Sequence, residues 1–246
     1  LSILVNKCSN VLKCADKRTV ILYLPNVVQL PIAILASLRI GNAVDDDAEM
    51  LAKIIIESDS VMIITIDGFW QGTVLYRTKY TVDEAVERSE KDISNILVIR
   101  HICPNKGIPE PQRNVLARRP YYPYKIFMKE GRDLHWSEEF MKANTDCIAQ
   151  EITEDQIVFL QAIYDAGKVK LIKRTLQQLY DKMERLDMIN LPPGLCFAVF
   201  DSDILLQMVA MINILARGHQ LLIFEGIMTY PDYSRISQII NLYKVN

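Results

Sequence analysis

The segment from Asp155 to Thr175 holds the residues best suited to binding a phosphate group. It reads DQIVFLQAIYDAGKVKLIKRT and places Gly167, Lys168 and Lys170 soon after an apolar run. Glycine lets the backbone approach a phosphate closely, and the lysine ammonium groups offset the phosphate charge. The same Gly-Lys pair is equally typical of a helix start with a solvated lysine. These three residues therefore form a candidate phosphate loop with a structural alternative.

A second group of candidate residues combines bases with tyrosines. It follows a proline-rich stretch, and its members are Arg118, Arg119, Tyr121, Tyr122 and Tyr124. Such a mixture can stack on nucleotide bases, or it can form a protein interface rich in tyrosine and arginine. We rank a plain surface loop first, a protein interface second and a ligand site third.

Composition and charge exclude several classes of protein. The chain has 246 residues, half of them apolar, with a net charge of −2 and a pI near 6.0. This balance gives no basis for binding nucleic acid or an anionic membrane surface. The longest apolar run, Ile204–Ala216, is too short to cross a bilayer. Five scattered cysteines without a CxxC pair and three isolated histidines indicate free thiols and no metal site.

Short apolar runs alternate with helical patterns along the chain. The runs have the length and composition of buried parallel strands. They cover Thr19–Leu24, Val61–Ile66, Ile96–Arg100, Ile157–Leu160, Cys196–Phe200 and Gln220–Phe224. The helical patterns cover Pro31–Ile40, Asp46–Ser58, Lys168–Asp187, Asp203–Ala216 and Tyr233–Tyr243. Strands separated by helices predict an α/β fold with mainly parallel sheets flanked by helices.

Three blocks of sequence stand out in order. They are YLPNVVQLPIAILASLRIG at 23–41, KEGRDLHW at 129–136, and the group FEG, TYPD, Arg235 and YKV between 224 and 245. They resemble the YLP…ELPIAMLACLRIG, EGRDLWW and FEG-x-x-TYPD…KYKV segments of AMP-forming acetyl-CoA synthetases, which belong to the ANL adenylating enzyme superfamily. The resemblance implies a partial synthetase-like N-terminal domain. We expect α/β subdomains at 1–102 and 128–246, joined by a linker or hairpin at 103–127, although both could pack as one domain.

The candidate phosphate loop departs from the pattern of the family it resembles. The family's loop reads roughly YTSGSTGKPKG, and this chain reads QAIYDAGKVKL. Only Gly167, Lys168 and Lys170 keep the family's identity, whereas Tyr164 and Asp165 replace a glycine and a serine. Tyr164 places a ring where the backbone must touch the ligand, and Asp165 adds a charge that repels a polyphosphate. The comparison implies that ATP and CoA do not bind, with no cofactor and no catalytic residues.

Together these observations predict a catalytically inactive synthetase-like protein that serves as a structural or accessory subunit of a larger assembly. The expected partners are other protein subunits, without nucleic acid and without a membrane span. Two alternatives stay open, namely a ligand-sensing module that binds a nucleotide or an acyl-CoA, and an acetate–CoA ligase completed by another chain. By analogy with recruited metabolic enzymes, we expect an intracellular location on the matrix side of mitochondria, with ciliary and cytosolic locations as alternatives.

Overall fold

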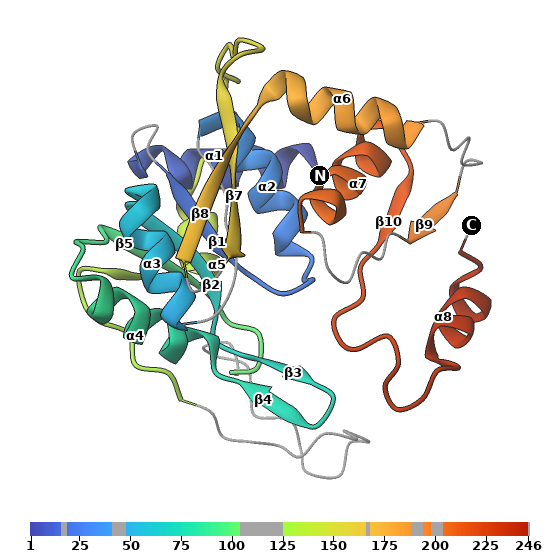
Figure 1. The fold of residues 1–246 in the computed structure, drawn as a ribbon, viewed down its shortest axis with the longest axis horizontal. Coiled ribbons are helices and arrows are strands. Elements are labelled where there is room, and N and C mark those ends of the chain that lie inside the picture. Colours follow the sequence, from blue (N-terminus) through green and yellow to red (C-terminus); the bar gives the residue numbers. More distant parts are fainter. Residues whose placement is uncertain are drawn as a thin grey trace.

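The computed structural model describes residues 1–15, 19–40, 48–103, 125–165, 168–187, 194–197 and 204–245 (Figure 1). The predicted protein interface, made of Arg118, Arg119, Tyr121, Tyr122 and Tyr124, lies outside these residues, and so does Gly167. The predicted division into subdomains at 103–127 stays a prediction.

A parallel sheet forms the centre of the first part of the chain. Its strands are β1 (Val20–Tyr23), β2 (Met62–Ile66), β5 (Asn95–Ile99) and β6 (Asp133–His135), in the order β1–β2–β5–β6. All three pairings are parallel. The predicted strands Thr19–Leu24, Val61–Ile66 and Ile96–Arg100 are confirmed within one or two residues as β1, β2 and β5, because continuous apolar runs suit strands that are covered on both faces. Strand β6 was not predicted.

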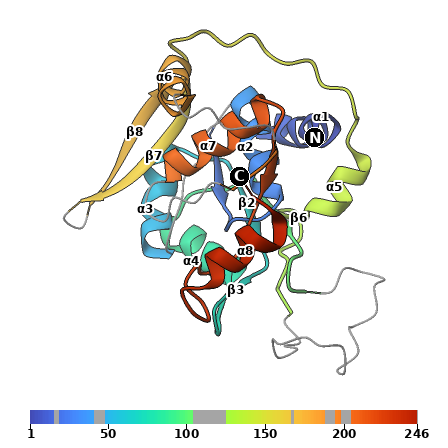
Figure 2. The same ribbon diagram turned by 90° about the vertical axis from the view of Figure 1, so that its right-hand side faces the viewer.

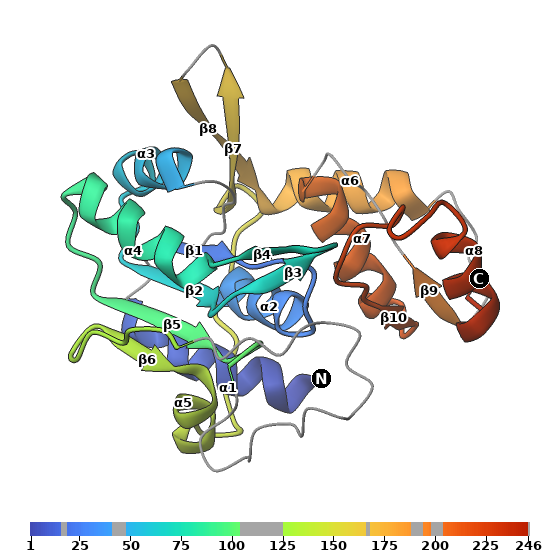
Figure 3. The same ribbon diagram turned by 90° about the horizontal axis from the view of Figure 1, so that it is seen from below.

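Helices cover the two faces of this sheet. Alternate strand residues enter two different cores, with Leu22 and Ile64 in one and Ile21 and Ile63 in the other. The first core contains residues of α1 (Ser2–Leu12), α2 (Gln29–Ile40) and α5 (Trp136–Lys142), and the second contains residues of α3 (Ala48–Ser58) and α4 (Thr78–Ser89). Figure 3 shows the two helix groups on opposite sides of the strands. A 3₁₀ turn at Lys13–Ala15 follows α1.

An antiparallel hairpin interrupts the α/β pattern. Strand β7 (Ile157–Asp165) pairs with β8 (Lys168–Thr175), and helix α6 (Leu176–Asp187) follows directly. The predicted helix over Lys168–Asp187 is therefore wrong for its first eight residues. In β8 the apolar residues Val169 and Leu171 pack on the second core while Lys168 and Lys170 are exposed, which is the two-residue period of a strand.

Helix α7 (Ile204–Ala216) packs on α6, α2 and β10. Strands β9 (Leu195–Phe197) and β10 (Gln220–Leu222) form a two-stranded parallel sheet, and α8 (Arg235–Tyr243) is the last helix (Figure 1). A small hairpin, β3 (Phe69–Gln71) and β4 (Val74–Tyr76), extends from the end of β2. Within the described ranges, none of the helices is long and apolar enough to cross a membrane.

Candidate functional site

The two described lysines of the candidate phosphate loop lie on an exposed strand. Lys168 and Lys170 are the first and third residues of β8, opposite Asp165 and Ile163 in the register of the hairpin. Figure 2 shows this end of the hairpin projecting away from the rest of the molecule. Lys168 and Lys170 therefore extend from an exposed strand, and not from the first turn of a helix as the sequence pattern suggested.

A cavity of about 590 Å³ lies beside β8 and the end of α3. The residues that line it are Thr19, Glu57, Ser58, Ile157, Leu160, Val169, Lys170, Leu171 and Lys173. Polar and apolar groups contribute about equally to this lining, with two lysines and one glutamate beside the apolar side chains. Ser58 is buried, and its hydroxyl has no hydrogen-bond partner among the described residues. The hydroxyl oxygen is itself enclosed by protein atoms, so a group that enters the cavity does not reach it. This groove places one predicted loop residue, Lys170, in a setting that can hold a ligand.

A second polar constellation lies at the carboxyl edge of the parallel sheet, where α/β proteins bind ligands most often. Asp67 follows β2 directly and is fully buried. Its carboxylate accepts backbone N–H groups from Gly68 at 2.8 Å, His101 at 2.9 Å, Ile102 at 3.0 Å and Cys103 at 2.7 Å. Asp67 thus ties the loop after β5 to the end of β2.

Histidines and charged residues extend this edge. His101 Nε2 lies 2.7 Å from the Oε2 atom of Glu225, which belongs to the FEG block after β10. Arg100 Nη2 lies 3.0 Å from His135 Nε2. Burial, together with the charge of Asp67, raises the pKa of Cys103 to about 12. The thiol of Cys103 is therefore protonated at neutral pH and is not a ready nucleophile.

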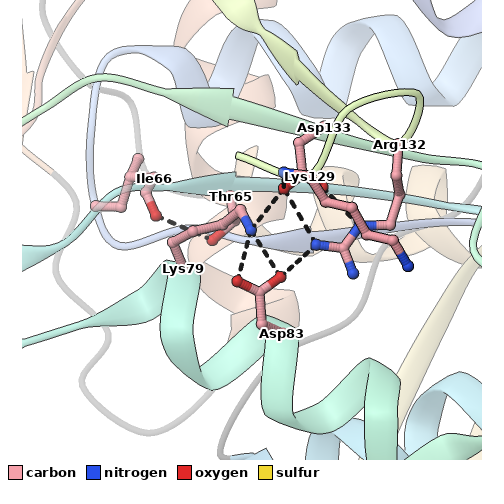
Figure 4. Close-up of polar contacts among 7 residues, drawn as sticks. All are labelled: Thr65, Ile66, Lys79, Asp83, Lys129, Arg132 and Asp133. Carbon is pink, nitrogen blue, oxygen red and sulfur yellow. Dashed lines mark hydrogen bonds and ion pairs between the residues drawn. The ribbon is translucent and has the colours of Figure 1, made fainter. Parts of the chain in front are cut away.

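Arg132 and Asp133 of the EGRD block form an ion cluster with Lys79 and Asp83 between α4 and β6 (Figure 4), in which Lys79 and Asp133 are buried. Lys79 of α4 contacts Asp83 at 2.6 Å and Asp133 of β6 at 2.9 Å, and Arg132 contacts both carboxylates. Burial by itself would raise the pKa of Asp133, but hydrogen bonds from Arg132 and Lys79 outweigh it and hold the pKa below its ordinary value. The two positive and two negative charges pair with one another, so the cluster joins α4 to β6. We therefore assign it a structural role.

The sequence analysis missed both the cluster and Asp67. An aspartate placed directly after an apolar strand was a usable signal for Asp67, because parallel strands bring their carboxyl ends to one edge. For Lys79 the local signal was Asp83 at i+4, whereas its second partner, Asp133, is remote in sequence. Within the described ranges, no group of three or more metal-binding side chains occurs.

Comparison with known proteins identifies relatives over almost the whole chain. No protein-family profile matches it. The acetyl-coenzyme A synthetase of Desulfatibacillum aliphaticivorans is 28% identical over 261 residues, and that of Vibrio vulnificus (strain YJ016) is 30% identical over 257 residues. Each alignment covers 98% of this chain and 36% of the relative. The structure of acetoacetyl-CoA synthetase from Streptomyces lividans matches with a TM-score of 0.74 over 96% of this chain and 35% of that one, at 17% identity, which supports the fold alone.

These relatives correct one expectation. The chain was expected to be no enzyme because its phosphate loop has changed, yet the proteins it matches are named as synthetases. Loss of loop hydroxyls does not remove a chain from an enzyme family, because the remaining blocks still align across nearly its full length. The expected fold, a partial synthetase-like domain with a parallel sheet between helices, is confirmed. The chain is a relative of the acetyl-CoA synthetases and spans about a third of their length.

Proposed function

We propose that this chain is the scaffold part of an acyl-CoA synthetase-like protein, on which further polypeptide docks through helix α8. One observation carries the proposal. Three residues of α8 at helical spacing, Ile236, Ile240 and Tyr243, are exposed by 38%, 42% and 52%, and Tyr233, which lies two residues before the helix, is exposed by 85%. A stripe of this kind on a soluble protein marks a contact surface.

Helix α8 has little apolar contact of its own with the rest of the chain. Ile239 is its one buried residue, and Leu242 is 74% exposed. A nine-residue helix is marginal in water without tertiary packing. The unpaired stripe is therefore best explained by a partner surface that covers it. In this proposal the partner is another subunit of a larger assembly, and that assembly is located in the mitochondrial matrix.

The test compares variants on opposite sides of α8. Ile240→Asp places a charge in the stripe, and Gln238→Asp places the same charge on an exposed polar position as the matched control. Size-exclusion chromatography with light scattering on protein purified from its source should show a defined complex, which Ile240→Asp disrupts and Gln238→Asp keeps. A monodisperse monomer for the native protein, unchanged by either substitution, would refute docking through α8.

The groove beside β8 favours a second candidate, in which the chain binds a nucleotide or an acyl-CoA. Lys170 and Lys173 line this groove, and both side chains are exposed. Titration calorimetry with ATP and with CoA tests the idea directly. Micromolar binding that Lys170→Glu abolishes would support it, and no heat change at millimolar ligand would end it.

A further inference from the structure

The outer edge of β8 is an unpaired strand edge. Among the described strands, β8 pairs only with β7, and Figures 2 and 3 show it on the open side of the hairpin. Along an antiparallel ladder, every second residue directs its N–H and C=O away from the partner strand. The described part of the chain supplies no other partner to the backbone of residues 168–173. This edge therefore offers unused donors and acceptors in strand geometry.

The side chains along this edge carry an excess of positive charge. Lys168, Lys170 and Lys173 are all exposed. Lys168 lies opposite Asp165, whereas Lys170 lies opposite Ile163 and Lys173 opposite Leu160, so Lys170 and Lys173 have no carboxylate directly across the hairpin. Neither lysine forms an ion pair with any described residue. Carboxylates on a neighbouring strand would find these ammonium groups available.

The groove beside β8 can hold the apolar side chains of such a strand. Val169, Leu171 and Leu160 form its apolar wall. Glu57 is the one acidic residue among those that line the cavity. Along β8, Lys168 and Lys170 lie on one face, whereas Val169, Leu171 and Lys173 lie on the other. A strand with acidic and apolar residues in alternation would place its carboxylates near Lys168 and Lys170 and its apolar side chains along the wall.

We propose that the open edge of β8 binds an extended acidic segment of a separate polypeptide by strand addition. Backbone hydrogen bonds supply the affinity, and the lysines select acidic side chains at alternate positions. This surface lies on a different part of the molecule from α8 (Figure 1). The two docking surfaces are therefore independent, and either can fail in experiment without the other.

The test uses a fluorescein-labelled peptide with alternating glutamate and valine and the whole 246-residue chain. Fluorescence anisotropy at low salt should give saturable binding with a Kd below about 1 mM. Lys170→Glu should weaken binding at least about fivefold, because an attractive cross-strand pair becomes repulsive. Glu57→Gln should tighten it, since it removes the acidic residue of the groove. Lys125→Glu carries the same charge change at an exposed site elsewhere and should leave binding unchanged.

A second peptide separates strand addition from simple charge attraction. It has the same sequence with alternate backbone nitrogens methylated, so it keeps its charges but loses ladder donors on one edge. It should bind at least about tenfold more weakly, and amide exchange at residues 168–173 should slow only with the unmethylated peptide. Equal binding of both peptides, equal binding by the native chain and Lys170→Glu, or no binding at about 1 mM would each overturn the proposal. Circular dichroism of each variant establishes that it is folded.

Discussion

The buried cation Lys79 allows a direct test of how α4 is held to the sheet. Its side chain is 1% exposed, and it lies 2.9 Å from the fully buried carboxylate of Asp133. At an effective dielectric constant of about 20, two unit charges at this distance attract by about 6 kcal/mol, which desolvation of both groups largely offsets. Substitution of Lys79 by methionine leaves two carboxylates, Asp83 and Asp133, with Arg132 as their one cation. We expect this variant to lose about 3–5 kcal/mol of unfolding free energy.

The matched variant removes one carboxylate as well. In the double variant Lys79→Met with Asp133→Asn, the remaining pair of Arg132 and Asp83 is balanced in charge. The double variant should therefore be more stable than the sum of the two single effects by about 1–3 kcal/mol. Urea unfolding at pH 7, followed by circular dichroism, measures all four proteins. Single losses below about 1 kcal/mol, or effects that add within about 0.5 kcal/mol, would refute the role given to the cluster.

The pH dependence of the unfolding free energy is an independent test of the direction of the Asp133 pKa shift. Because the pKa of Asp133 is lowered in the folded protein, its ionisation stabilises the native chain above about pH 4. That contribution is lost as the pH falls through the folded-state pKa. In Lys79→Met two carboxylates share one guanidinium, so we expect one folded-state pKa to rise above its unfolded value. The penalty is then largest at pH 7, and the gap to the native protein should narrow towards pH 4.

Three further outcomes test other parts of the structure. Gly72→Ala should lower the unfolding free energy by about 1–2 kcal/mol, because Gly72 has φ +61°. Gly218→Ala is the control, since Gly218 has φ +77° and no atom near its added Cβ, and it should cost a similar amount if backbone strain dominates. A far larger loss at Gly72 would implicate the Tyr230 ring, which lies 3.5 Å from the added Cβ. Asp67→Asn should lower the unfolding free energy by about 2 kcal/mol in urea titrations, and no change would contradict its role in tying the loop after β5. Cys103, with its pKa near 12, should react with iodoacetamide about a thousandfold more slowly than an ordinary thiol at pH 8, and Asp67→Asn should speed the reaction. Mass spectrometry of the modified peptide measures both rates. Alkylation of the native chain at the ordinary rate would refute the raised pKa.

The elements that sequence reasoning found are those whose burial is uniform. Val61–Ile66 was predicted as a strand and forms β2 at Met62–Ile66, because a short apolar run covered on both faces has few other solutions. The missed elements depend on tertiary contacts. Strand β6 has only three residues, Asp133–His135, and its strand conformation comes from pairing with β5. Helix α1 was not predicted, although Val5, Cys8 and Leu12 face the core at helical spacing.

The candidate site was predicted only in part for a similar reason. Lys168 and Lys170 were identified by their identity with a family loop, and that resemblance is independent of the secondary structure they adopt. Lys79 was not identified, because a buried lysine is readable only after its carboxylate partner has been placed beside it. Residue identity thus located the hairpin, whereas charge pairing across the fold became visible only in three dimensions.

The hairpin also shows why the period of a pattern matters more than its composition. KVKLIKRT can be read as one face of a helix or as a strand in which Lys168 and Lys170 alternate with apolar residues. In a helix that continues into α6, its lysines would lie on a solvated face with every backbone group satisfied. In a strand they mark an edge at which every second residue has an unused N–H and C=O, beside a groove with an apolar wall. The same residues that suggested a solvated helix face therefore define a surface able to bind another strand.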